Sequence, residues 1–167
     1  MRMIETVKSH RVCGGELRYC RHHSGATNTP MTFSVFTPEG PGPFPVLLWL
    51  SGLTCTEDNF TTKAGAYPSA AAHGLMIVAP DTSPRGDNVA NDPAYDLGQG
   101  AGFYVDATQS PWKPHFQMET YIVRDLIPDD KLGVQFRTAA DNFRLIDDED
   151  QATVFVRYDG YPGIDAL

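Results

Sequence analysis

A short loop after a run of apolar residues carries the groups in this chain that are best suited to chemistry. Ser51, Thr54 and Cys55 supply two hydroxyls and a thiol, and Gly52 lets the backbone turn among them. The preceding apolar run, Val46–Leu50, is typical of a strand buried on both faces of a parallel sheet. Ligands of open α/β sheets bind outside the carboxyl ends of such strands. The sequence therefore predicts a ligand-facing loop after this strand.

A second group of residues near the N-terminus could be considered as metal ligands. It consists of Cys13, Cys20, His22 and His23. Their spacing fits no familiar zinc pattern. Successive side chains of a strand point to opposite faces, so His22 and His23 are expected on opposite sides of a sheet. We therefore expect no metal site here and interpret the segment as a β-hairpin.

The elements that position these groups follow from the pattern of apolar residues and turn residues. Antiparallel strands followed by a strand–helix–strand unit predict an α/β fold with a mixed sheet, whose parallel part begins at Val46. Residues 80–115 are rich in Gly and Pro and predict a long loop with a functional or packing role. The predicted elements are hairpin strands at Ile4–Val12 and Glu16–His22, a strand at Met31–Thr37, the buried strand Val46–Leu50, a helical segment Asn59–His73 divided at Pro68, a buried strand at Leu75–Ala79 and an amphipathic helix at Phe116–Ile127.

Composition restricts the classes of partner and compartment. The chain has 167 residues, enough for one domain with a core. Its formal net charge of −8 disfavours nucleic acid and anionic membranes as partners. The N-terminal residues contain no apolar run of signal-peptide length, and no stretch approaches a membrane span. With three cysteines, an odd number, we expect reduced thiols and a cytoplasmic protein.

Several long motifs, in the same order and register, resemble S-formylglutathione hydrolase, in the esterase D group of the α/β-hydrolase fold. The resemblance extends over about Cys13 to Pro128. It implies a serine thioesterase that hydrolyses S-formylglutathione to glutathione and formate in formaldehyde detoxification. It further implies a small-molecule thioester as the substrate, and neither a metal nor an organic cofactor. The matching motifs are SGLTCTEDNF, HGL, APDTSPRG, GQGAGFYVDATQSPWKPHF and ETYIVRDLIP.

The resemblance assigns one functional group within the loop. It implies that the backbone N–H of Leu53 is one of the two donors of an oxyanion hole, which stabilises the negative oxygen of a tetrahedral intermediate. Ser51, Gly52 and Thr54 then lie near the active site. Cys55 corresponds to a family cysteine near the active site that is not the nucleophile.

The catalytic triad of the family is absent from this sequence. In this fold the nucleophile lies in G-x-S-x-G, and the acid and histidine follow it in the chain. No serine here lies in such a motif, none follows Ser110, and the last histidine is His115. Residues 1–128 are therefore interpreted as the N-terminal part of a hydrolase domain. Residues 129–167 are interpreted as an unrelated tail with one strand at Ala152–Tyr158, in a truncated or rearranged gene product.

Four functions remain open from the sequence. The first is a hydrolase-like protein that is inactive alone. The second uses Cys55 as a substitute nucleophile with His73 as its base, although an inert thiol is the simpler interpretation. The third is a non-catalytic interaction module, because a partial sheet exposes an edge and apolar surface that favour self-association. The fourth is a fragment completed by a separate chain that carries the triad.

Overall fold

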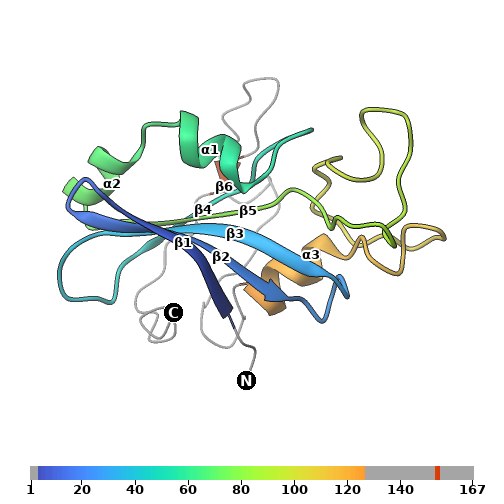
Figure 1. The fold of residues 1–167 in the computed structure, drawn as a ribbon, viewed down its shortest axis with the longest axis horizontal. Helices are drawn as coiled ribbons and strands as arrows, with labels where there is room; N and C mark the ends of the chain where they lie inside the picture. Colours follow the sequence, from blue (N-terminus) through green and yellow to red (C-terminus); the bar gives the residue numbers. More distant parts are fainter. Residues whose placement is uncertain (1–3, 127–152, 155–167) are drawn as a thin grey trace, which may run out of the picture.

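Six strands form one mixed sheet in the computed structural model, which describes residues 4–126 and 153–154 (Figure 1). The strand order is β1-β2-β3-β5-β4-β6. Strands β1, β2 and β3 pair antiparallel, β3 pairs antiparallel with β5, and β5 pairs parallel with β4. This arrangement confirms the predicted α/β fold with a mixed sheet.

The N-terminal hairpin is present at the predicted place. It consists of β1 (Ile4–Val12) and β2 (Gly15–His23), and Cys13 and Gly14 form the turn at positive φ. The side chain of His22 is buried and that of His23 is exposed, which confirms their opposite faces. β3 (Pro30–Thr37) follows and agrees with the predicted third strand within one residue.

The parallel unit runs from β4 (Val46–Trp49) through α1 (Glu57–Lys63) and α2 (Tyr67–Ala72) to β5 (Met76–Pro80). Two helical pieces were predicted, but the division at Pro68 was wrong. The break falls at Gly65, and Pro68 lies in the first turn of α2. Proline is tolerated there because the first-turn amides have no acceptor within the helix.

The start of α1 was also placed too late, at Asn59. Thr56 is the N-cap, and its hydroxyl accepts a hydrogen bond from the Asp58 amide. The side chain of Asn59 in turn accepts one from the Thr56 amide. This reciprocal capping box ends the site loop sharply and begins the helix.

The expectation that β4 is buried on both faces is only half correct. Val46 and Leu48 are almost completely buried, whereas Leu47 and Trp49 on the opposite face are partly exposed. The short helices α1 and α2 cover that face incompletely, and the indole of Trp49 stacks on Phe60 of α1. β5 is buried along its whole length.

Each face of the sheet has its own apolar core. On one face, Phe60 of α1 and Ala70 of α2 pack on Leu17, Phe36 and Ile77. The other face packs against α3 (Met118–Thr120) and the π-helical turn η1 (Tyr121–Leu126), whose buried residues are Met118, Tyr121, Ile122 and Asp125. In Figure 1, α1 and α2 lie above the sheet, and α3 lies below it.

The amphipathic helix predicted at Phe116–Ile127 is therefore present with two corrections. It begins at Met118, after the non-helical Gln117, whose side chain donates hydrogen bonds to the Ala107 and Lys113 carbonyls. It continues as a π-helical turn and not as an α-helix. Its predicted apolar face, Met118, Tyr121, Ile122 and Leu126, does pack on the sheet. Ile127 lies outside the described residues.

Of the predicted tail strand Ala152–Tyr158, residues Thr153–Val154 form β6, which pairs antiparallel with Leu48 and Trp49 of β4. Its other residues lie outside the described part of the chain. The predicted boundary at residue 128 lies there too and stays a prediction. None of the helices in residues 4–126 is long and apolar enough to cross a bilayer.

Candidate active site

The loop that follows β4 is fixed at Ser51 by two hydrogen bonds from different segments. The Ser51 side chain is buried, and its hydroxyl accepts a hydrogen bond from the indole Nε1 of Trp49 at 3.0 Å. Its backbone carbonyl accepts one from the Tyr104 hydroxyl at 2.7 Å. Burial, with the nearby Asp81 carboxylate, raises the pKa of Tyr104 far above its usual range, so its hydroxyl remains a donor.

Residues 52–55 then form a tight turn. The Cys55 amide donates to the Gly52 carbonyl at 3.3 Å. Thr54 has a φ of 64°, in the left-handed region that β-branched residues rarely adopt. Its amide donates to the Gly100 carbonyl at 2.7 Å. An exposed residue in this conformation persists only where its surroundings impose it, and such positions cluster at functional sites.

The amides of Gly52 and Leu53 are the unused donors of this turn among the described residues. Within the described part of the chain, the Leu53 N–H donates to no acceptor, whereas the amides of Thr54 and Cys55 on its C-terminal side are both bonded. The side chain of Leu53 is partly exposed. A backbone N–H held by a rigid turn and left without an acceptor can bind a negatively charged oxygen.

Gly102 lies directly against this turn. A Cβ atom at Gly102 would meet the Gly52 carbonyl carbon and the Leu53 nitrogen, each at 3.0 Å, and Gly102 has a φ of 70°. Both the left-handed conformation and the close backbone approach therefore require glycine here.

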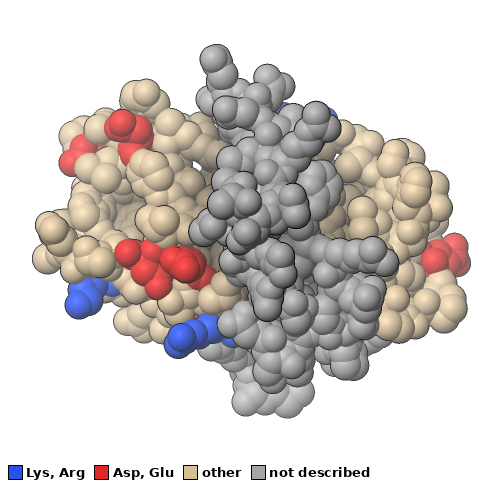
Figure 2. Space-filling model, turned by 180° about the vertical axis from the view of Figure 1, so that it is seen from behind, with Lys and Arg blue, Asp and Glu red and all other residues tan. Residues whose placement is uncertain are grey.

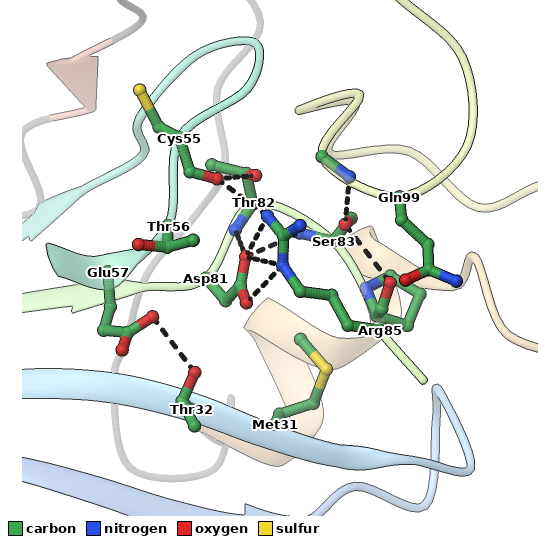
Figure 3. A network of polar contacts seen from close by, with 12 residues as sticks. Met31, Thr32, Cys55, Thr56, Glu57, Asp81, Thr82, Ser83, Arg85 and Gln99 are labelled. Atoms are coloured by element: carbon green, nitrogen blue, oxygen red, sulfur yellow. Dashed lines mark hydrogen bonds and ion pairs between the residues drawn. The ribbon is translucent and has the colours of Figure 1, made fainter. Parts of the chain in front are cut away.

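A second loop, after β5, lies beside the first (Figure 3). Residues 81–84 are buried. The Asp81 carboxylate accepts hydrogen bonds from the Thr82 amide at 2.6 Å and from the Arg85 guanidinium at 2.8–3.1 Å. Thr82 Oγ1 and Arg85 Nη2 both donate to the Cys55 carbonyl, at 2.5 and 3.0 Å.

An apolar cavity of about 150 Å³ lies beside this loop pair. Its walls come mainly from the long Gly-rich segment that the sequence predicted to be a functional or packing loop. Leu97, Phe103 and Val105 are exposed around it, which leaves apolar surface next to the site. The lining residues are Thr82, Ser83, Leu97, Gly98, Ala101, Gly102, Phe103, Val105, Ala107, Trp112 and Phe116.

The site residues predicted from sequence, Ser51, Gly52, Leu53, Thr54 and Cys55, lie together in one turn. The suggested base His73 does not join them. It follows α2, and its Nδ1 lies 2.8 Å from the Ser69 carbonyl. In the described residues no hydrogen bond connects the His73 ring with the Cys55 thiol. The structure therefore gives no support to a Cys55–His73 pair.

No group of three or more His, Cys, Asp or Glu side chains suited to a metal ion is found among residues 4–126. The buried His22 ring instead packs against Phe33 and Tyr121, and its Nε2 lies 3.3 Å from the Tyr121 hydroxyl. On the face seen in Figure 2, charged side chains of the described residues form small separate groups.

Glu57 is the acidic group at the end of the site loop. Burial raises its pKa above that of an exposed glutamate, and this effect exceeds the opposing hydrogen bonds from its own amide and from Thr32. The Thr32 hydroxyl donates to Glu57 Oε2 at 3.0 Å. The charges of Asp81 and Asp58 raise its pKa further.

Sequence reasoning missed the residues that support the turn. They are Asp81, Thr82, Arg85, Gly100, Gly102 and Tyr104, and they come from the predicted long loop. A signal was available, because Asp and Arg stand four residues apart and glycines occupy alternate positions 98, 100 and 102. Nothing in that pattern indicated which other segment the glycines approach.

Comparisons with known proteins agree with this architecture. The family model described as "Putative esterase" matches residues 24–146. A curated S-formylglutathione hydrolase of Paracoccus denitrificans is 56% identical over 124 residues, which are 73% of this chain and 44% of that protein. A solved S-formylglutathione hydrolase from Agrobacterium tumefaciens superposes with a TM-score of 0.71 at 40% identity, covering 72% of this chain and 45% of that one.

The chain thus spans somewhat less than half the length of these two relatives. The matching part includes the whole βαβ unit and both site loops. The family match covers well over half of the chain, and the structural likeness covers 72% of it. The chain therefore belongs to this esterase family, with an α/β-hydrolase fold related over its N-terminal part to the S-formylglutathione hydrolases.

Proposed function

We propose that this chain carries the oxyanion-binding part of an S-formylglutathione hydrolase-type site and does not hydrolyse thioesters by itself. The observation that carries the proposal is the Leu53 N–H, held in a rigid turn and bonded to no acceptor among the described residues. The substrate class, a small thioester, comes from the similarity to S-formylglutathione hydrolases. The role we propose for the chain belongs to formaldehyde detoxification in the cytoplasm.

We expect the chain to be inactive by itself because it lacks the catalytic side chains of a serine esterase. A serine esterase needs an activated serine, a histidine base and a carboxylate that orients it. Residues 1–167 contain no G-x-S-x-G motif and no histidine after His115. Loss of one oxyanion donor costs on the order of 10²–10³ in rate, whereas loss of the nucleophile removes the covalent pathway.

An esterase assay on the purified chain tests this proposal. We expect no turnover of S-formylglutathione or p-nitrophenyl acetate above the rate in buffer. A rate that disappears in the Cys55→Ser variant and after thiol alkylation would replace the proposal with cysteine catalysis. A rate that survives both treatments would contradict the proposed inactivity outright.

Pairing with another chain is the second candidate function. One edge of β4 is paired with β5, and on its other edge the described residues provide only the two-residue β6, opposite Leu48 and Trp49. An incompletely paired strand is a template for a strand of another chain. We expect self-association, or esterase activity on co-expression with a chain that carries the triad. A monodisperse monomer in light scattering, together with inactive co-expressed samples, would contradict this role.

A further inference from the structure

Arg85 connects the two loops of the site. Its Nε and Nη2 atoms donate to the Asp81 carboxylate at 2.8–3.1 Å, and Nη2 also donates to the Cys55 carbonyl at 3.0 Å (Figure 3). Asp81 belongs to the loop after β5, and Cys55 to the loop after β4. One guanidinium group therefore holds a backbone carbonyl of the site turn against the neighbouring loop.

Asp81 gives this guanidinium a fixed direction. Its carboxylate is almost fully buried and also accepts from the Thr82 amide at 2.6 Å and the Ser83 amide at 3.4 Å. A planar guanidinium that faces an immobilised carboxylate through two donors has little freedom to rotate. Its third contact, with Cys55, is then set by the geometry of the first two.

The Cys55 carbonyl receives a second donor from the same loop, the Thr82 hydroxyl at 2.5 Å. Thr82 is completely buried, so this hydroxyl has no access to water. A carbonyl with two donors at fixed positions cannot rotate without leaving buried polar groups unpaired. The backbone on the C-terminal side of Leu53 is thereby fixed.

Thr54, which directly follows Leu53, is held by the same loop through Gly100. Ser83 Oγ accepts from the Gly100 amide at 2.6 Å, and the Gly100 carbonyl accepts from the Thr54 amide at 2.7 Å. A Cβ at Gly100 would lie 3.6 Å from both Nη atoms of Arg85 and 3.7 Å from Thr54 Cα. Arg85 and Thr54 therefore both lie against the same side of Gly100.

We propose that Arg85 is a positioning residue of the site: by binding the Cys55 carbonyl while Asp81 holds its guanidinium, it sets the direction in which the Leu53 N–H points. The inference rests on the proposed oxyanion role of Leu53, and it extends that role to a residue remote from the turn in sequence. Among the described residues, no hydrogen bond joins Arg85 to Leu53 itself. Lysine cannot replace it, because a single ammonium group does not supply a planar fork and a third directed donor.

Amide hydrogen exchange and amide chemical shifts, measured by NMR on the full chain, test the proposal. In Arg85→Lys we expect exchange at Thr54 and Cys55 to accelerate by about tenfold or more, the factor expected for loss of one charge-assisted hydrogen bond. The Leu53 amide resonances should shift as well. Exchange at Val35 and Val78, in the centre of the sheet, should be unchanged. The matched control is Arg21→Lys, at an exposed arginine of β2, which should alter neither group.

A second variant keeps the test decisive if Arg85→Lys folds poorly. Thr82→Val removes the other donor to the Cys55 carbonyl with little change in volume and none in charge. It should affect the same amides by a smaller factor. Unchanged Leu53, Thr54 and Cys55 amides in both folded variants would overturn the proposal. Equal acceleration throughout the sheet would also overturn it, because Arg85 would then stabilise the fold without positioning the turn. Neither outcome depends on the esterase assay, so failure here is distinct from failure of the proposed function.

Discussion

The loops after β4 and β5 both leave the sheet at the carboxyl ends of their strands, because the two strands are parallel neighbours. The two loops differ in burial and in hydrogen bonding. In the β4 loop, residues 52–56 are partly or fully exposed, and Thr54 adopts a left-handed conformation. In the β5 loop, residues 81–84 are buried and supply hydroxyl and carboxylate groups to their surroundings. One loop presents backbone donors, and the other holds it in place.

The exposed turn of the β4 loop is held in place although it has no apolar core of its own. The β4 loop has few apolar side chains to bury, so burial cannot fix its backbone. Its order comes from hydrogen bonds with buried partners, which are costly to leave unsatisfied. Polar side chains at the end of one strand thereby determine the conformation at the end of the next.

The largest effect is expected where the long Gly-rich segment touches the turn. Gly102→Ala introduces a Cβ at 3.0 Å from Gly52 and Leu53 and places alanine at positive φ. We expect the free energy of unfolding to fall by about 2–4 kcal/mol, from strain and overpacking together. Gly65→Ala is the control, because Gly65 also has positive φ but open space around it. It should cost only about 1–2 kcal/mol. If urea denaturation gives the same loss of unfolding free energy for both variants, the contact of Gly102 with the turn contributes nothing to stability.

A smaller effect, of opposite sign, is expected within the exposed loop. Thr54→Gly relieves a left-handed conformation that costs about 1–2 kcal/mol, while the flexibility of glycine in the unfolded chain costs about 0.5–1 kcal/mol. We expect the variant to be as stable as the parent or more stable, by up to about 1.5 kcal/mol. Thr62→Gly, at an exposed position of α1, should instead destabilise. Thermal melts measure both variants. If the melting temperatures of Thr54→Gly and Thr62→Gly shift in the same direction, the conformation of Thr54 is not strained.

The smallest expected effect is on the pH dependence of stability, and it concerns the acidic groups that border the two loops. Asp81 forms an ion pair with Arg85, whereas Glu57 has no ion pair among the described residues. The pKa of Glu57 is raised on folding, so its contribution to stability is fully present below its unfolded pKa, at about pH 4, and is lost as the pH rises through the folded pKa. Glutamine does not titrate. The stability of Glu57→Gln relative to the parent should therefore increase between about pH 4 and pH 7. A difference that stays constant or decreases in urea titrations would show that burial does not raise this pKa.

Much of the fold was predictable because its strands have local signatures. Alternation around Gly14, the apolar run from Val46 and the buried strand at Met76 specify their elements almost alone. The errors occurred where a boundary depends on side-chain hydrogen bonds, as in the capping box of Thr56 and Asn59. Pro68 was read as a break although it is compatible with a first helical turn.

Only one of the two loops of the candidate site was predictable from the sequence. The turn from Ser51 to Cys55 was identified from its place after a strand and from a family resemblance. Its supports were not, because the bond of Arg85 to Cys55 and the contact of Gly102 with Leu53 join segments far apart in the chain. Local patterns carry no information about such pairings, which arise only when the long loop folds back on the sheet.

The bond between Tyr104 and Ser51 closes a loop of 53 positions, and the bonds of Arg85 and Thr82 to Cys55 close loops of 30 and 27. Contacts of such separation form slowly, because the intervening chain must be ordered before they contribute stability. The hairpin and β3 pair locally and can fold much earlier. During synthesis, the turn at Ser51–Cys55 emerges well before Gly100, Gly102 and Tyr104 exist to hold it. The geometry of the turn at Ser51–Cys55 is thus a late product of folding, acquired after the sheet that carries it.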